Sequence, residues 1–156
     1  MNIRHAKKSD IPTVEKLLSE VLELHHTGRP DIFKSGRTKY TSSELESIIE
    51  CDKTPIFVAE KATRVLGYAF CIIKETKNDN ILHDSKTLYI DDLCVDEDAR
   101  GEGIGGALYE YVLEYAKSIG CDSITLNVWE CNKSARSFYE KKGLVPQKTI
   151  MEYVIK

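Results

Sequence analysis

The chain of 156 residues has no long hydrophobic segment. No run of about 18 or more apolar residues occurs, so we expect no transmembrane helix, and residues 1–8 lack the apolar stretch of a secretory signal. The five cysteines are odd in number and include no C-x-x-C pair, which argues against a disulfide framework or a zinc site. These absences predict a cytoplasmic protein with no membrane partner and no bound metal.

An excess of positive charge is also missing. The formal net charge is −3, so no basic field attracts nucleic acid, and we expect no nucleic-acid partner. An anionic ligand must therefore be held by local geometry. The chain lacks repeats, low-complexity stretches and linkers, and its length and apolar fraction predict a single domain, residues 1–156, with its own core.

A glycine-dense segment is the most informative part of the chain. An apolar strand over 88–95 is followed by a polar turn, the sequence Arg100-Gly101-Glu102-Gly103-Ile104-Gly105-Gly106, and an amphipathic helix over 102–119. Glycine lets the backbone approach a ligand closely, and the first N–H groups of a helix are unsatisfied donors. With Arg100 at the mouth, this segment predicts a site for a pyrophosphate.

The same segment also satisfies the G-x-G-x-x-G pattern of dinucleotide-binding folds. Such a fold has its glycine loop directly after the first strand and an acidic residue about 20 residues further on. Here the loop comes two-thirds of the way along the chain, after strands that are predicted to be antiparallel. The nearest acidic residue past the next strand is Glu130, which is further from the loop than the pattern requires. The dinucleotide interpretation is therefore disfavoured, and a Walker loop is excluded because no Gly-Lys-Ser/Thr ends the segment.

Periodicity of apolar residues predicts the remaining elements. Helices are expected to start at 9–12 and at 41–44 and to cover 102–119 and 132–142. Strands are expected over 2–5, 55–60, 65–73, 88–95, 124–128 and 149–155. This order predicts an α/β fold with a mixed sheet in one layer and helices on both faces.

Two motifs in this order resemble those of the GNAT superfamily of N-acetyltransferases. Its acyl-CoA signature, Gln/Arg-x-x-Gly-x-Gly/Ala, is met by Arg100, Gly103 and Gly105. A second pattern, N-x-x-A-x-x-x-Y-x-x-x-G-F, is met by Asn132, Ala135, Tyr139 and Gly143, with Leu144 in place of phenylalanine. The resemblance implies a GNAT-like, mostly antiparallel central sheet.

The resemblance further implies an enzyme that transfers the acetyl group of acetyl-CoA, its cosubstrate, to a primary amine by direct attack in a ternary complex. A homodimer is common in the superfamily. The expected cofactor-binding residues are Leu93, Cys94 and Val95 along the pantetheine, Arg100, Gly101, Glu102, Gly103, Ile104, Gly105 and Gly106 at the pyrophosphate, and Asn132, Ser134 and Ala135 near the CoA arm. Asn132 has a second expected role, which is to cap its own helix.

Tyr139 is the expected general acid, which would protonate the departing CoA thiolate; the alternative is an ordinary core aromatic next to Phe138. The acceptor amine must lose a proton, and Asp91 and Asp92 are the candidate bases. Adjacent residues of a strand point to opposite faces, so we expect at most one of them to face the acceptor directly. Asp91 is the first choice, either as base or as the residue that binds a cationic amine.

Other candidates border the long connection over 27–40, namely His25, His26, Arg29 and Asp31. His26 and Arg29 are predicted to bind the acceptor. Cys94 suggests an acyl-cysteine route, but no histidine lies near it in sequence to activate it. The sequence does not distinguish between two kinds of acceptor, a small amine such as a polyamine or amino acid and a protein amine. The alternative function is a non-catalytic acyl-CoA-binding module, against which Tyr139 argues.

Overall fold

The computed structural model describes residues 1–156, which form one five-stranded sheet in the order β1-β2-β3-β4-β5. The strands are β1 (Asn2–His5), β2 (Ile56–Lys61), β3 (Arg64–Thr76), β4 (Ser85–Val95) and β5 (Ser123–Leu126). Neighbouring strands are antiparallel from β1 to β4, and β5 runs parallel to β4. The expected mixed, mostly antiparallel sheet is confirmed.

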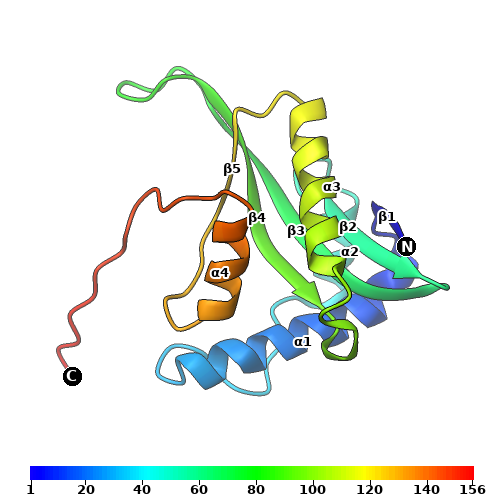
Figure 1. Ribbon diagram of the computed structural model, residues 1–156. Helices are drawn as coiled ribbons and strands as arrows, with labels where there is room; N and C mark the ends of the chain where they lie inside the picture. The colour runs from blue at the N-terminus through cyan, green and yellow to red at the C-terminus, as the bar shows by residue number, and fades with distance from the viewer.

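Helices cover both faces of this sheet, as predicted (Figure 1). α1 (Ile11–Gly28) and α2 (Ser42–Ile49) pack on one face, and α3 (Ile104–Ser118) with α4 (Lys133–Lys141) on the other. Short 3-10 turns, η1 (Lys8–Asp10) and η2 (Glu97–Ala99), precede α1 and α3. No helix is both long enough and apolar enough to span a bilayer.

Each face has its own hydrophobic core. The core under α1 and α2 includes Leu17, Leu45, Val58, Tyr68 and Cys94. The core under α3 includes Phe57, Ile90, Leu108 and Val112. Alternate residues of the central strands point into the two cores, which is why β2 and β3 read as nearly continuous apolar runs.

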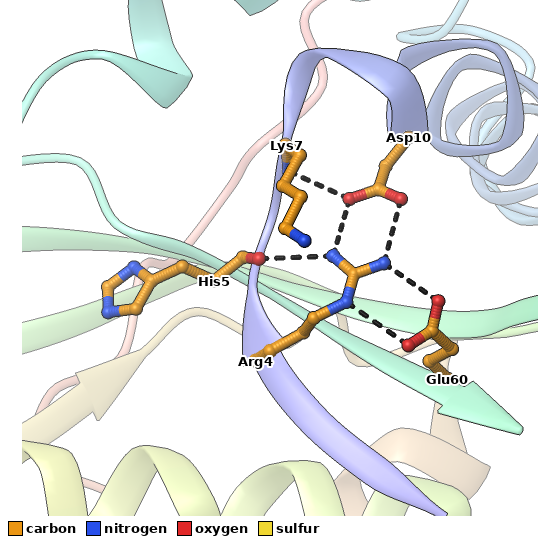
Figure 2. Close-up of polar contacts among 5 residues, drawn as sticks. All are labelled: Arg4, His5, Lys7, Asp10 and Glu60. Carbon is orange, nitrogen blue, oxygen red and sulfur yellow. Dashed lines mark hydrogen bonds and ion pairs between the residues drawn. The ribbon is translucent and has the colours of Figure 1, made fainter. Parts of the chain in front are cut away.

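Arg4 joins the N-terminal strand to the rest of the molecule (Figure 2). Its guanidinium donates to Asp10 at 2.7 and 3.0 Å and to Glu60 at 3.0 and 3.3 Å, which links β1 to β2 and to the start of α1. Burial alone would raise the pKa of Asp10, but the hydrogen bonds from Arg4 and from the Lys7 backbone N–H outweigh it and lower that pKa.

The strand expected over 149–155 is wrong for the single chain. Residues 142–156 form no helix or strand, and residues 145–156 are all exposed. In Figure 1 this segment leaves the end of α4 and runs away from the sheet. A strand forms only where its backbone groups find a neighbouring strand, and this segment has none within the chain.

Candidate active site

A β-bulge in β4 sets the geometry of the site. Phe70 of β3 lies opposite Asp92, and Cys71 lies opposite Ile90, which leaves Asp91 without a partner. The extra residue reverses the alternation, so Ile90 points into the α3 core whereas Cys94 points into the α1 core.

The bulge brings both carboxylates to one side, and the expectation that Asp91 and Asp92 point to opposite faces is wrong. Asp91 Oδ2 accepts a hydrogen bond from Lys39 Nζ at 2.7 Å, and Lys39 belongs to the connection between α1 and α2. Asp92 Oδ2 accepts from the hydroxyl of Tyr68 at 2.6 Å, and Tyr68 is in the core under α1. The rule of strict alternation fails because it assumes a regular ladder.

The electrostatics of these two acids differ. Burial raises the pKa of Asp92, although the Tyr68 hydroxyl, Lys39 and His25 each favour the ionised form. Asp91 instead forms an ion pair with Lys39. Sequence reasoning missed Lys39 and Tyr68 entirely: Lys39 lies in an irregular connection, and Tyr68 reads as one more apolar strand residue.

β4 and β5 separate beside the bulge. They pair only from Thr87 opposite Ser123 to Ile90 opposite Leu126. Residues 91–95 of β4 continue with β3 on one side and no strand on the other. Leu93, Cys94 and Val95, the residues predicted to pair with pantetheine, therefore lie along a free backbone edge.

The glycine loop lies directly against this edge. A Cβ at Gly105 would be 3.6 Å from Val95 Cγ2 and 3.9 Å from Phe138 Cε2, so the loop, the end of β4 and α4 meet there. The backbone N–H groups of residues 101–106 donate no hydrogen bond within the protein. Gly101 and Gly103 have φ values of +83° and +80°, which favour glycine. A row of donors without partners in the protein thus lies at the start of α3.

Two cations flank this row of donors. Arg100 is exposed at the mouth, and its Nε donates to the Val95 carbonyl at 3.3 Å. Lys142 Nζ would lie 3.5 Å from a Cβ at Gly106 and forms an ion pair with Glu110 at 2.8 Å. Lys142 was not predicted from the sequence, because it follows α4 and reaches α3 only through the packing of the two helices.

α4 carries the remaining predicted residues. The Asn132 side chain accepts from the Ala135 N–H at 3.1 Å, so it caps its own helix, the second of its two expected roles. Ser134 is exposed and Ala135 is half-buried. The Tyr139 ring meets Phe138 edge-on at 5.1 Å. Burial, reinforced by the charge of Asp92, raises the pKa of Tyr139, so its hydroxyl keeps its proton at neutral pH.

The sequence profile of the Acetyltransferase (GNAT) family matches residues 18–144. The chain belongs to the GNAT acetyltransferase family. The protein is 28% identical to the uncharacterized N-acetyltransferase YhfO of Bacillus subtilis, over 99% of this chain and 97% of that one. It is 32% identical to a mutant of the BH1408 protein of Bacillus halodurans, whose crystal structure superposes with a TM-score of 0.96 over 100% of both chains.

A third comparison concerns the fold alone. The crystal structure of an aminoglycoside N-acetyltransferase in complex with CoA is 15% identical to this GNAT protein, with a TM-score of 0.74 and 99% coverage of both chains. The expectation from the two motifs, that the chain is a GNAT acetyltransferase, is confirmed by the family match.

A small cavity of about 180 Å³ lies between the end of α1 and the β5–α4 connection of this acetyltransferase. His25, Phe33 and Trp129 line it, and the Phe33 and Trp129 rings meet edge-on at 5.2 Å. Burial lowers the pKa of His25, while the charge of Asp92 acts on it in the opposite direction. The cavity-lining His25 therefore lies within the electrostatic reach of Asp92.

The two residues predicted to bind the acceptor hold the connection after α1. His26 Nδ1 is hydrogen-bonded to the Phe33 carbonyl at 2.7 Å, and the Arg29 guanidinium forms ion pairs with Asp31 and Glu152. Neither residue lines the cavity, whereas the neighbouring His25 does. Sequence spacing placed the candidates at the correct connection but gave no means to choose between adjacent histidines.

Cys94 of this GNAT protein is poorly suited to covalent catalysis. It is 4% exposed, and burial raises the pKa of its thiol to about 12. Its Sγ lies 3.8 Å from the Leu17 carbonyl, on the α1 side of the sheet. A thiol of this kind is almost wholly protonated at neutral pH and is a weak nucleophile.

Proposed function

We propose that this protein transfers the acetyl group of acetyl-CoA to a primary amine by direct attack in a ternary complex. The observation that carries the proposal is the meeting of three features at the end of β4. These are the free N–H groups of 101–106, the unpaired backbone edge 91–95, and the two acids Asp91 and Asp92, of which Asp92 acts through its charge on Tyr139. The family of the chain supports the same chemistry.

The start of α3 suits the CoA pyrophosphate. Its unpaired N–H groups are donors without protein partners, and the helix dipole adds a favourable potential for an anion. Arg100 and Lys142 supply positive charge nearby. The free edge at Leu93–Val95 offers backbone groups to the amides of pantetheine, with one donor available to polarise the thioester carbonyl. Bound acetyl-CoA supplies an activated acyl group.

Tyr139 is proposed as the general acid. Its raised pKa keeps the hydroxyl protonated at neutral pH, so the group is able to donate to a sulfur that leaves as thiolate. Tyr139 follows Phe138, which packs on Gly105, so the phenol belongs to the part of α4 nearest the glycine loop.

Asp91 and Asp92 are proposed to bind and deprotonate the acceptor amine. Deprotonating a lysine-like amine at pH 7 costs about 4.6 kcal/mol, and an α-amine about 1 kcal/mol. Asp92, whose pKa is raised, is the better proton acceptor of the two because its conjugate acid is weaker than that of an ordinary aspartate. Asp91, which already binds the ammonium of Lys39, is proposed to hold a cationic part of the acceptor.

The shape of the site favours a small amine. The cavity beside His25 is about 180 Å³. It lies next to the connection between α1 and α2, from which Lys39 donates to Asp91. A polyamine or an amino acid of modest size fits these dimensions better than a folded protein surface. This preference ranks the acceptors to be tried first.

The test is release of free CoA thiol from acetyl-CoA with a panel of amines. We expect turnover with at least one small amine, and Tyr139→Phe should lower kcat by about 10²–10⁴-fold while CoA affinity is retained. Tyr115→Phe, a tyrosine that packs on Phe57 away from the site, is the matched control. Tight CoA binding with no turnover for any amine would instead support a binding module, and stabilisation by NAD but not by acetyl-CoA would contradict the proposal.

A further inference from the structure

A lysine ammonium lies directly at the acids of the candidate site. Lys39 Nζ donates to Asp91 Oδ2 at 2.7 Å, and the Lys39 side chain is 34% exposed. The two residues that follow Lys39 are anchored: the Tyr40 ring stacks on Phe70 at 5.9 Å, and Thr41 caps α2. Lys39 is therefore held beside the acids by the fold as well as by its ion pair.

The ammonium of Lys39 keeps its charge and has donors left for a ligand. Burial alone would lower the pKa of Lys39, but the hydrogen bond to Asp91 and the charges of Asp91 and Asp92 outweigh it and raise that pKa. An ammonium has three N–H donors, and Asp91 accepts one of them. Since the side chain is partly exposed, an anionic group of the acceptor can reach the others.

The charges of the site match those of an α-amino acid. A cation and an acid are in direct contact here, and an α-amino acid carries its ammonium and its carboxylate on one carbon. Lys39 contacts only Oδ2 of Asp91, which leaves Oδ1 for the ammonium of the acceptor. A diamine would instead bring a second ammonium towards Lys39, and like charges repel.

The cavity beside His25 suits the side chain of such an acceptor. Phe33 and Trp129 give it an aromatic wall, and its volume is about 180 Å³. The charges of Lys39 and Asp92 both act on the pKa of His25, in opposite directions, so the cavity and the charged groups belong to one region. An apolar side chain of modest size fits a cavity with this lining.

We propose that the acceptor is a free α-amino acid with an apolar side chain, and that Lys39 binds its carboxylate. The proposal rests on the acetyltransferase function proposed above. The α-nitrogen forms the amide bond as the thioester C–S bond breaks, its proton passes to Asp92, and the departing sulfur takes a proton from Tyr139. The product has lost its ammonium, and with it the attraction to the acids, which favours release.

Matched acceptors isolate the carboxylate. Release of CoA thiol is measured with leucine and phenylalanine, with isoamylamine and phenethylamine, which are the same molecules without the carboxylate, and with leucinamide and putrescine. Expressed per unprotonated amine, kcat/KM for each amino acid should exceed that for its decarboxylated amine by about 10- to 100-fold, the contribution of one hydrogen bond to a charged group. Leucinamide, which represents the α-amine of a protein, should be as poor an acceptor as isoamylamine.

Lys39→Met should remove this preference. We expect kcat/KM to fall by the same factor for leucine and not to fall for isoamylamine, whereas a merely structural role of Lys39 would lower both. Lys39→Arg keeps a cation at this position and should keep the preference. Lys34→Met, which changes an exposed lysine of the same connection, is the control.

Two results would overturn the proposal and leave the acetyltransferase function standing. One is turnover in which the decarboxylated amines, leucinamide or putrescine equal or exceed the amino acids. The other is a preference for the amino acids that survives Lys39→Met. Absence of turnover with every amine would contradict the acetyltransferase function itself, and the choice of acceptor with it.

Discussion

Replacing Tyr68 by phenylalanine isolates one hydrogen bond at the centre of the site. Tyr68 is fully buried, and its hydroxyl donates to Asp92 at 2.6 Å. The substitution removes the hydroxyl and keeps the ring that packs on Phe70. The carboxylate of Asp92 then loses a donor that stabilises its charged form.

The size of the effect follows from the strength of such a bond. A hydrogen bond to a charged group contributes about 1.5–3 kcal/mol, and a tenfold change in a proton equilibrium corresponds to about 1.4 kcal/mol. Burial already raises the pKa of Asp92, and the Tyr68 bond opposes that rise. Its removal therefore raises the pKa further, and the acidic limb of the pH–rate profile should move upward by about one to two pH units.

The assay is kcat/KM against pH, with acetyl-CoA and an amine that the panel identifies as acceptor. Above the shifted limb Tyr68→Phe should reach the rate of the unmodified enzyme, because Asp92 is then ionised in both. Asp92→Asn should abolish the limb, and Tyr115→Phe should leave it in place. The carboxyl ¹³C resonance of Asp92 gives the same pKa without an acceptor.

A limb that stays in place or moves to lower pH in Tyr68→Phe would refute the assignment of Asp92 as base. The direction of the pKa change should also be visible in the free energy of unfolding. The ionised form of Asp92 is disfavoured in the fold, so Tyr68→Phe should be most destabilising above the folded pKa of Asp92. The destabilisation should shrink as the pH falls through the raised folded pKa of Asp92, because the carboxyl is then protonated in the fold and gains less from the hydroxyl, while the unfolded state titrates alike in both proteins.

Three further predictions concern the loop, the thiol and the N-terminal strand. Gly103→Ala, at a positive φ in open space, should lower the unfolding free energy by about 1–2 kcal/mol and should weaken CoA binding as measured by calorimetry. The control Gly120→Ala, at φ +72°, should lower the unfolding free energy by the same amount and leave the CoA affinity unchanged. Cys94, whose thiol pKa is about 12, should resist iodoacetamide at pH 8 by peptide mass mapping while exposed Cys131 reacts, and Cys94→Ala should keep its activity. Arg4→Met should lower the unfolding free energy by about 1.5–3 kcal/mol at pH 7 in urea titrations; because the pKa of Asp10 is lowered, this loss should disappear as the pH falls through that pKa.

The elements themselves were largely predictable from the sequence, because helix and strand periods are local properties. α3 was expected over 102–119 and covers Ile104–Ser118, and the strand expected over 88–95 is the end of β4. Its start at Ser85 was missed because the polar residues there pair with the outer half of β3. The tail was the clear failure: its strand pattern is real, but pairing is not a local property.

The residues of the candidate site also divide into those that the sequence indicates and those that it does not. The glycine loop, the strand before it and Tyr139 could be named as candidates from the sequence because each belongs to a motif with fixed spacing. Lys39, Tyr68 and Lys142 were not, since each reaches the site from a distant part of the chain. The orientation of the two acids was predicted incorrectly because a bulge is a property of two paired strands.

The sequence by itself determined where a backbone can approach an anion and which family the chain resembles, since glycine placement and helix starts act over a few residues. Only the tertiary structure decided that both carboxylates lie on one side, that one of them has a raised pKa, and which neighbours act on it. Burial and charge depend on groups far apart in the chain, so they exist only once the sheet and its two helical layers have assembled.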